Sequence, residues 1–526
     1  MNHRLVFRLL GTISWLIGLT MAFSLPIAFA DVGGQAEFES RGFYALIASI
    51  AICASVGLVL RAAGRSAPET LYRKEAMAIV GLSWVLATIL GAFPYFLGSV
   101  VYTSTAGAEV PMGVAESFFE SQSGFSTTGA TVLTDIENER WVPRCILFWR
   151  SSTHFLGGLG IIVLFVAVLG QGSAGKALMR AEIPGPSKEG SHERMQHTAL
   201  VFAAIYCGLN ATLALLLRFE GMTWFEAICH AFGTMATGGF STRNASLGGF
   251  ESRAIEYTVI FFMILAGTNF ALLYFTLIRK PGRLLGDPEW RTYIGVIVVC
   301  TMMVMAVGIW VTTDFNAQGN LSTQEEYETA FRDGLFQVVS TLTTTGYGTA
   351  DFDLWNSFSR ALLIVLMFVG GCAGSTGGGM KVIRHILFVK ILRREVERSY
   401  HPSVVRHIRL KGESLLDPDL PRNILVYFGL VALIFTLSSQ VIVGIEPDST
   451  WIKAGQPVSN KLIDTASAVA ATMHNIGPGL GIVGSTQNYA PFTALPKLLF
   501  TFLMMLGRLE LFAILVLVEP GFWRER

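Results

Sequence analysis

One short segment has residue types suited to binding a dehydrated cation: Thr343-Thr344-Thr345-Gly346-Tyr347-Gly348. In potassium selectivity filters, backbone carbonyl oxygens point into a pore and replace the water shell of the ion. Glycine is needed there because successive inward carbonyls require backbone angles that residues with a Cβ adopt poorly. An ordinary turn is equally compatible with this composition, since glycine and threonine are common in turns. The hypothesis therefore depends on whether the segment recurs.

The same build recurs three more times. The further segments are Ser126-Thr127-Thr128-Gly129-Ala130, Ala236-Thr237-Gly238-Gly239-Phe240 and Asn475-Ile476-Gly477-Pro478-Gly479. Their first glycines and Gly346 follow one another at intervals of 109, 108 and 131 residues, which indicates repeated structural units. We therefore expect potassium to bind at Gly129, Gly238, Gly346 and Gly477. The predicted filter consists of Thr128, Gly129, Thr237, Gly238, Thr345, Gly346, Tyr347, Ile476 and Gly477.

An acidic residue precedes each of these glycines at a nearly constant distance. Glu116, Glu226, Asp333 and Asp464 lie 13, 12, 13 and 13 residues upstream, and a mostly apolar stretch fills each interval. Each interval predicts a short helix with a carboxylate in its first turn, where the helix dipole favours negative charge. The C-terminal end of this helix then points at the glycine turn. The carboxylates either only stabilise the helix N-termini or also gather cations at the outer mouth of a pore.

The composition indicates a polytopic membrane protein. Of the 526 residues, 52% are hydrophobic and 15% are charged, against about 25% charged in soluble domains. Several apolar runs reach the roughly 20 residues that cross a bilayer. The net charge of +1 gives no reason to expect nucleic acid as a partner. The six cysteines are scattered without a C-x-x-C pair, so we expect small buried hydrophobes rather than disulfides or metal ligands.

The apolar runs predict an all-α fold with ten spanning helices and four re-entrant loops. A leading hairpin (9–30 and 42–62) precedes four units around one central pore, each with an outer helix, a pore loop and an inner helix. The first run resembles a signal peptide, but it is long enough to span, and we expect a retained helix. The outer and inner helices are predicted at 76–102 and 143–171, 197–218 and 254–279, 291–313 and 357–395, and 422–444 and 492–519. The matching divisions are 1–70 for the hairpin and 71–195, 196–285, 286–420 and 421–526 for the repeats.

Charge asymmetry predicts the orientation of these helices. Basic residues gather on one side of the predicted topology, and by the positive-inside rule this side is cytoplasmic. The segments with the glycine turns fall on the other side and are comparatively acidic. The filter is therefore expected to face outward and both termini to face the cytoplasm. The basic residues are Arg61, Arg65, Arg73 and Lys74; Lys176, Arg180, Lys188 and Arg194; Arg279, Lys280, Arg283 and Arg291; and those of segment 381–411.

The third inner helix is interrupted by ten consecutive small or polar residues, 370–379. Non-helical backbone at membrane depth survives only where it is buried in protein or faces a water-filled cavity. Broken helices of this kind mark ion pathways in transporters. We expect a mobile gate just below the third filter segment, with a packed hinge that never moves as the alternative. The predicted gate residues are Gly370, Gly371, Gly374, Ser375, Thr376, Gly377, Gly378, Gly379, Lys381 and Arg508.

Arg508 is a second anomaly, because it lies in the middle of the last apolar run. A charge within the membrane normally faces a cavity or a partner. Below a cation filter, a guanidinium would repel ions and limit conduction. An ion pair with Glu510 or another carboxylate is the alternative.

Together these features resemble the Trk/Ktr/HKT superfamily of potassium transporters over nearly the whole chain. The features are the four filter segments, the break Gly374-Ser375-Thr376-Gly377-Gly378-Gly379 and the sequence Gly507-Arg508-Leu509-Glu510. The resemblance implies potassium uptake across a bacterial inner membrane, a homodimer with one pore in each protomer, and contact with membrane lipids. It also implies a TrkA-like cytosolic ring whose bound nucleotide controls opening.

Two positions refine what the resemblance implies. Some relatives that look sodium-selective have serine at the first filter position, so Gly129 argues for potassium. Pro478 lacks an N–H and stiffens the fourth turn, which implies a less regular filter than in a tetrameric channel.

Other motifs in the chain are decoys. Residues 479–484 fit G-x-G-x-x-G but follow a turn rather than a strand. The segment around Lys381 is similar to a phosphate loop, but Met380 precedes the lysine in place of glycine and Val382 follows it in place of serine or threonine. We expect His154, His230 and His474 to be core residues, because they lack metal-ligand spacing.

Three functional hypotheses remain. They are a gated potassium pathway, potassium uptake coupled to sodium or protons, and, remotely, an intramembrane hydrolase that uses Ser375. A hydrolase would need a base within hydrogen-bond reach of that serine. The two transport hypotheses predict no enzyme activity and no cofactor, with K⁺ as the transported ion.

Overall fold

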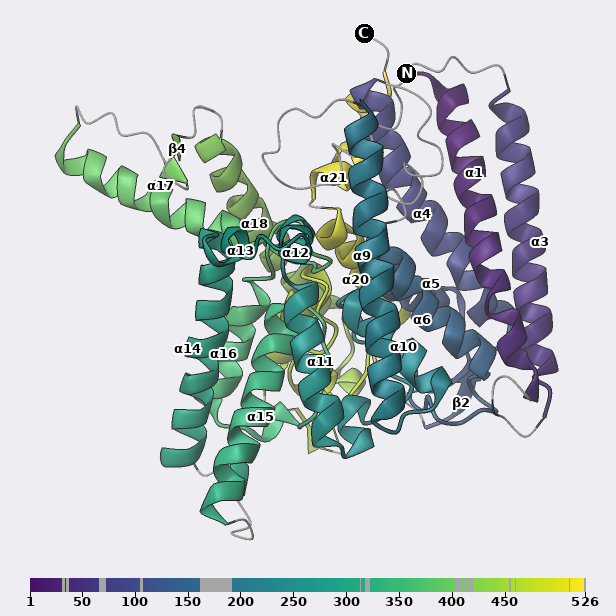
Figure 1. Cartoon of the computed structure of the whole chain (residues 1–526). Coiled ribbons are helices and arrows are strands. Elements are labelled where there is room, and N and C mark those ends of the chain that lie inside the picture. The colour runs from purple at the N-terminus through teal and green to yellow at the C-terminus, as the bar shows by residue number, and fades with distance from the viewer. Residues whose placement is uncertain are drawn as a thin grey trace.

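The described part of the chain is almost entirely helical (Figure 1). A computed structural model describes the chain except residues 31–33, 35–36, 66–71, 105–106, 161–191, 313, 317–321, 403–408, 411–412, 415–419, 454–455, 459, 510 and 525–526. Three two-stranded antiparallel hairpins are present within the described ranges: β1 (Val101–Thr103) with β2 (Glu109–Pro111), β3 (Arg409–Leu410) with β4 (Glu413–Ser414), and β5 (Ile452–Lys453) with β6 (Gln456–Pro457).

The leading hairpin consists of α1 (His3–Ala22), a short 3-10 helix η1 (Leu25–Ala28) and α3 (Ser40–Ala63). Small residues let α1 and α3 approach closely, since a Cβ at Gly18 would lie 3.0 Å from the Cβ of Cys53. The Ser14 hydroxyl donates to the carbonyl of Cys53 at 2.6 Å. The hairpin stands beside the rest of the molecule along α4 (Figure 1).

Four successive units of outer helix, pore helix and inner helix follow the hairpin. The first has α4 (Arg73–Leu97), α5 (Val114–Phe125) and α6 (Arg144–Leu159); the second has α9 (His192–Phe219), α10 (Trp224–Met235), and α11 (Arg253–Ala266) with α12 (Phe270–Leu277). The third has α14 (Pro288–Trp310), α15 (Thr323–Leu342), and α16 (Ser357–Met367) with α17 (Val382–Tyr400). The fourth has α18 (Leu420–Ile445), α19 (Lys461–Met473), and α20 (Ala494–Arg508) with α21 (Phe512–Val518). Short helices lie between these elements: η2 (Ser246–Phe250), α13 (Gly282–Leu285), η3 (Asp314–Asn316), η4 (Phe352–Leu354), η5 (Asp448–Thr450) and η6 (Gly481–Val483). The last element of the described chain is α22 (Pro520–Trp523).

The inner helices are broken in the second, third and fourth repeats, whereas the sequence predicts a break only in the third. α11 and α12 meet at an angle of 105° across residues 267–269, where the Asn269 side chain caps α12. α20 and α21 are separated at residues 509–511, where Leu511 has φ +66°. α6 ends at Leu159, and the remainder of the predicted helix 143–171 lies outside the described residues. The break in the third, between Met367 and Val382, is where the sequence predicts it.

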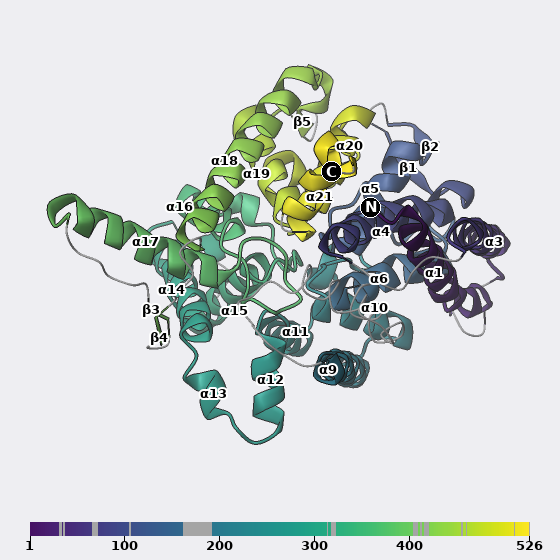
Figure 2. The ribbon, with the colours of Figure 1, turned by 90° about the horizontal axis from the view of Figure 1, so that it is seen from above.

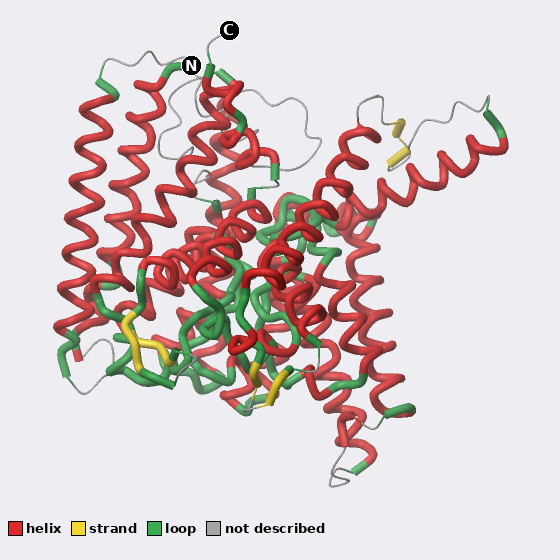
Figure 3. The backbone as a smooth tube through the Cα atoms, turned by 180° about the vertical axis from the view of Figure 1, so that it is seen from behind, coloured by secondary structure: helices red, strands yellow, loops and turns green. Residues whose placement is uncertain are grey.

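Six helices of the described chain are long and apolar enough to span a membrane, or seven if α11 and α12 form one bent span. The six are the two of the leading hairpin and the four outer helices. The sequence predicts ten spans, and the other three are the first, third and fourth inner helices. The breaks in the third and fourth inner helices leave non-helical backbone in the middle of the molecule (Figure 3).

Three of the four pore helices have the predicted length and the predicted acid in the first turn: Glu116 in α5, Glu226 in α10 and Asp464 in α19. The third prediction is wrong. α15 starts ten residues earlier than Asp333, with Ser322 as its N-cap and Glu325 completing a capping box. Asp333 therefore lies within α15, and the helix N-terminus does not explain its position.

The chain winds once around a central axis (Figure 2). Seen along that axis, the blue first repeat, the teal second, the green third and the yellow fourth follow one another around the middle of the molecule. Both termini and α17 lie at one end, and the β1–β2 hairpin and the start of α15 lie at the other (Figure 1). This arrangement brings the four glycine turns together.

Candidate ion pathway

The four glycine turns meet around a common opening. In each turn a glycine faces a backbone carbonyl of a neighbouring turn so closely that no Cβ fits between them. The contacts lead from the first turn to the second, third and fourth and back to the first, so they close a ring. The facing pairs are Gly129 with Gly238, Gly239 with Thr345, Gly346 with Ile476, and Gly477 with Thr128.

The backbone repeats the same left-handed pattern in all four turns. One residue with φ between 51° and 60° is followed two positions later by a glycine with φ between 77° and 100°. The first members are Thr127, Thr237, Thr344 and Asn475, and the second members are Gly129, Gly239, Gly346 and Gly477. Only glycine adopts such φ values without strain, so each ring glycine is required by its backbone.

This pattern shifts the second turn by one residue relative to the spacing of first glycines. Gly239, and not Gly238, takes the place of Gly129, while Gly238 takes the place of Thr128, Thr345 and Ile476. The amide of Gly238 bonds to the carbonyl of Gly233 as that of Thr128 bonds to Ser123. With this register, Glu226 also lies 13 residues before its glycine, as in the other three repeats.

Hydroxyl groups hold the first and third turns against their own pore helices. Ser123 donates to the carbonyl of Ala130 at 2.6 Å, and Ser340 donates to that of Tyr347 at 2.7 Å. Hydroxyl pairs also link Ser126 with Thr128 and Thr343 with Thr345, at 2.6 and 2.8 Å. These six serines and threonines fix the first and third turns to the C-terminal ends of their pore helices.

The fourth turn is held differently, because it lacks threonine. The Asn475 amide donates to the Thr128 hydroxyl at 3.0 Å and to the carbonyl of Met504 at 2.8 Å. The Tyr489 hydroxyl donates to the carbonyl of Gly477 at 2.9 Å. The carbonyl oxygen of Gly477 is therefore bonded to a side chain of the same repeat.

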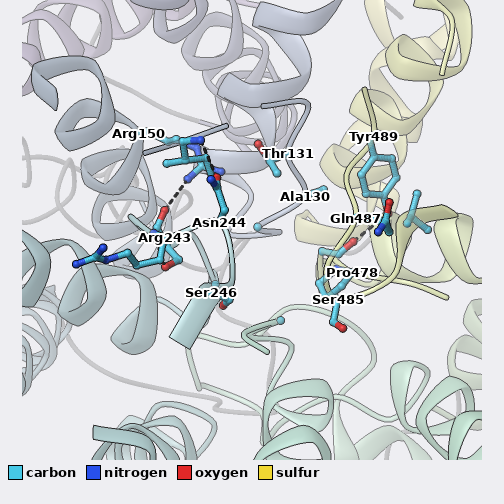
Figure 4. Close-up of a pocket in the computed structure, with 17 residues that line it drawn as sticks. Ala130, Thr131, Arg150, Arg243, Asn244, Ser246, Pro478, Ser485, Gln487 and Tyr489 are labelled. Carbon is cyan, nitrogen blue, oxygen red and sulfur yellow. Dashed lines mark hydrogen bonds between the residues drawn. The ribbon is translucent and has the colours of Figure 1, made fainter. Parts of the chain in front are cut away.

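An outer cavity of about 70 Å³ lies on one side of the ring (Figure 4). Its wall includes the ring glycines Gly129, Gly239, Gly346 and Gly477. In Figure 4, Arg150, Arg243 and Asn244 come from the first two repeats, and Pro478, Ser485, Gln487 and Tyr489 stand across from them. The presence of Arg150 in this wall was not anticipated from the sequence.

The intramembrane loop between α16 and α17 packs directly against the other side of the ring. The amide of Gly378 donates to the Thr344 hydroxyl at 2.7 Å, and the Thr376 hydroxyl donates to the carbonyl of Met235 at 2.9 Å. Gly377 lies against the carbonyl of Thr343 and Gly379 against that of His474. The loop thus contacts the ends of the second, third and fourth pore helices.

Two cationic side chains bind the carbonyls of this loop. Arg508 donates to the carbonyl of Thr376 at 2.8 Å and to that of Gly157 at the end of α6. Lys381, only 5% exposed, donates to the carbonyls of Gly377 and Gly378. Three successive loop carbonyls are therefore neutralised by cations of the protein itself. The proposed partner Glu510 lies outside the described residues.

The start of the loop is attached to the second and third repeats. Gly370 lies against the carbonyl of Met380, which closes the loop on itself, and Gly371 approaches the carbonyl of Gly267. Gly374 packs on the Asn269 side chain, and the Glu289 carboxylate accepts the amides of Ala373 and Ile383 at 2.7 and 3.1 Å. The hydroxyl of Ser375 has no hydrogen-bond partner among the described residues, and so no base that would activate it.

The four predicted acids are all bonded within the protein. The buried Glu116 pairs with Lys497 at 2.9 Å, and Glu226 pairs with Arg243 at 2.7 Å. Asp464 accepts the amide of Ile482 at 3.1 Å, and Asp333 lies 3.5 Å from Arg332. The sequence analysis missed the basic partners Lys497 and Arg243.

His154 and His230 are buried and bonded as core residues. His154 bonds the carbonyl of Gly124 at 2.8 Å through Nδ1 and accepts the amide of Phe240 at 3.2 Å through Nε2. His230 bonds the carbonyl of Glu226 and the Ser241 hydroxyl, at 2.8 and 2.9 Å. His474 is also buried, but its Nε2 has no hydrogen-bond partner in the described structure. No group of three metal-ligating side chains occurs among the described residues.

Apolar spanning helices around a ring of backbone carbonyls define a helical membrane transport protein. The chain belongs to the TrkH family of cation transport proteins, whose profile matches residues 44–522. It is 34% identical over 530 residues to the Trk system potassium uptake protein TrkH of Halomonas elongata, and 35% identical over 536 residues to that of Escherichia coli K12. Both alignments cover 100% of each chain.

A solved structure has the same fold. The crystal structure of the potassium transporter TrkH from Vibrio parahaemolyticus matches with a TM-score of 0.82 and 31% identity, over 100% of both chains. The superfamily resemblance and the all-α membrane fold expected from the sequence are thereby confirmed. The relatives are named as potassium transport proteins and not as enzymes.

Proposed function

We propose that this protein takes up potassium across the inner membrane of a bacterium through a filter of backbone carbonyls. The observation that supports it best is the closed ring, in which a glycine of each turn lies against a backbone carbonyl of a neighbouring turn. Potassium binds at Gly129, Gly238, Gly346 and Gly477, with Gly239 added to the second turn. The names of the relatives support potassium as the transported ion.

The intramembrane loop gates this pathway. In the described conformation it lies against the ring and is bonded to Thr344, Met235 and Arg508, so it obstructs the route below the filter. Glycine backbone and the absence of large side chains let such a loop change shape readily. Opening requires Arg508 and Lys381 to release the loop carbonyls.

Regulation comes from a cytosolic TrkA-like partner that binds nucleotide, and the protein acts as a homodimer with both termini in the cytoplasm. The relatives are named as members of a "Trk system", which supports a further component. Both termini and α17 lie at the end of the molecule opposite the β1–β2 hairpin (Figure 1). Lys74 lies beside the C-terminus, where its Nζ donates to the carbonyl of Arg524 at 2.9 Å, and a basic residue there supports a cytoplasmic C-terminus.

The test is rubidium flux into liposomes that contain the purified protein. A gated pathway gives passive current that reverses at the rubidium equilibrium potential and changes when the partner and nucleotide are added. Uptake that requires a sodium or proton gradient favours coupled transport instead. No flux under any of these conditions contradicts the proposal.

Deleting residues 375–377 tests the loop as a gate. The deletion removes the Thr376 contacts with Met235 and Arg508, and we expect higher rubidium flux. Flux equal to that of the wild type supports a packed hinge that never moves.

A further inference from the structure

A fully buried ion pair attaches the first filter turn to its surroundings. Arg150 of α6 and Glu120 of α5 are 1% and 0% exposed, and Nε lies 2.6 Å from Oε1. The same carboxylate accepts the Thr131 hydroxyl at 2.9 Å and the Val132 amide at 3.1 Å. Glu120 thus holds the backbone that leaves the ring just after Gly129.

Arg150 extends this attachment to the second turn. Its Nη1 donates to the carbonyl of Ser241 at 3.3 Å, and its guanidinium carbon lies 3.4 Å from the ring centroid of Phe240. The Ser241 hydroxyl is in turn bonded to Nε2 of His230 at 2.9 Å. One guanidinium therefore joins the backbone segments that follow Gly129 in the first turn and Gly239 in the second.

This bridge is confined to the first two turns. Glu120 and His230 occupy equivalent places, nine residues before Gly129 and Gly239, and each bonds a hydroxyl two residues after its glycine. The third and fourth repeats have Gln337 and Ala468 at these places, and glycine in place of the hydroxyl residue. The third and fourth turns therefore lack an equivalent of this bridge at these two positions.

We infer that Glu120 and Arg150 are positioning residues that set the cation selectivity of the filter, an inference that rests on the proposed function. They act by fixing the distance between the first and second turns, where Gly129 faces the carbonyl of Gly238. Arg150 also stands in the wall of the outer cavity (Figure 4), so its charge lies beside the route of the ion. Glu120 compensates that charge, and removing either partner leaves the other uncompensated in a buried site.

The experiment compares Glu120→Gln, Arg150→Gln and the double variant in liposomes. Rubidium flux and its inhibition by sodium give the selectivity, and the rubidium dependence gives the half-saturating concentration. We expect selectivity to fall about tenfold in all three, equivalent to about 1.4 kcal/mol, because the bridge is broken. The half-saturating concentration should rise in Glu120→Gln, fall in Arg150→Gln and return toward the wild-type value in the double variant.

A third variant and a matched control complete the design. Arg150→Lys keeps the buried cation but not the planar fork that reaches both Glu120 and Ser241, so selectivity should fall while half-saturation stays unchanged. Glu256→Gln breaks another buried pair, Glu256 with Arg332 at 2.6 Å, which does not touch the first two turns. Its selectivity should match that of the wild type.

The outcomes separate this inference from the proposed function. Rubidium flux by the wild type with unchanged selectivity in the Glu120 and Arg150 variants overturns the inference alone. The inference is also overturned if the half-saturating concentration shifts in the same direction in both single variants. The two variants change the local charge in opposite directions, so a common shift indicates a structural defect and not an effect of charge. No rubidium flux by the wild type contradicts the proposed function itself.

Discussion

Arg508 donates a hydrogen bond from Nη1 to the carbonyl oxygen of Thr376 at 2.8 Å, and so ties the last inner helix to the intramembrane loop. The same guanidinium reaches the carbonyl of Gly157, at the end of the first inner helix. One side chain therefore joins three repeats below the ring. Because the acceptors are backbone oxygens, a substitution of Arg508 removes the tie and leaves the sequence of the loop unchanged.

Replacing Arg508 by alanine should increase rubidium flux. The variant loses hydrogen bonds to a charged donor, worth about 1.5–3 kcal/mol each, so the open state should become about tenfold or more populated. Flux into liposomes without the partner or nucleotide measures this. Arg398→Ala is the control, because this arginine lies on the exposed side of α17 with 65% of its side chain accessible. Equal flux in both variants and the wild type would rule out a restraining role for Arg508.

Replacing Lys381 by methionine should also increase flux, with a smaller effect. The Lys381 ammonium binds two carbonyls of the loop. Lys381 directly follows the loop in the chain, whereas Arg508 comes from another repeat, so the Lys381 bonds stabilise the loop internally. Its loss should loosen the fold of the loop rather than detach it from the ring. The matched control is the exposed Lys280→Met, which should behave as the wild type. A decrease in flux would instead assign Lys381 a role in the open state.

Replacing Gly346 by serine should broaden selectivity toward sodium. Gly346 has φ +80° and faces the carbonyl of Ile476 without room for a Cβ, so the third and fourth turns must separate. Competition between sodium and rubidium for uptake measures the change. Gly348→Ala is the control two residues away, where an added Cβ meets the Ser485 Cβ at an ordinary 3.4 Å. Unchanged competition in Gly346→Ser would refute the tight packing of these turns.

Replacing Lys497 by methionine should destabilise the protein strongly. Lys497 is 2% exposed and pairs with Glu116 at 2.9 Å, so the variant leaves a carboxylate unpaired in a site with little water. Breaking such a buried pair costs about 3–5 kcal/mol. Thermal unfolding in detergent should show a clearly lower midpoint. Lys461→Met removes an exposed pair with Asp448 and should leave the midpoint unchanged, and similar midpoints for both variants would contradict the prediction.

The repeated order of helices was predictable from the sequence, because four acid-to-glycine intervals recur with apolar runs on both sides. The early start of the third pore helix also had a local signal, the capping box of Ser322 and Glu325. This signal lies outside the constant acid-to-glycine interval, which points to Asp333 instead. The bend of the second inner helix had a local signal as well. In Gly267-Thr268-Asn269, a good N-cap residue follows two positions after a glycine. The divisions between repeats stay a prediction.

The count of first glycines gave the wrong register for the second turn. Gly238 and Gly239 are adjacent, and a count of first glycines selects the wrong one for the left-handed position. The backbone conformation distinguishes them, because Gly239 and not Gly238 has a positive φ. The constant interval of 13 residues, which holds for Gly239, was a usable signal in hindsight.

The partners of buried charges were the least predictable part of the site. Lys497 and Glu116 are 381 positions apart, and Arg150 meets Ser241 across 91 positions. No local pattern specifies such pairs, because they depend on how the repeats assemble. A charge inside an apolar segment, such as Glu120 or Arg150, signals only that some partner exists.

In a channel made of identical subunits, every substitution appears four times at the opening. In this protein one chain supplies all four turns, so a single substitution changes one side of the ring and leaves the other three sides unchanged. Under the proposed function, ion preference can therefore change in small steps, and Asn475 and Pro478 already make one side of the ring unlike the other three.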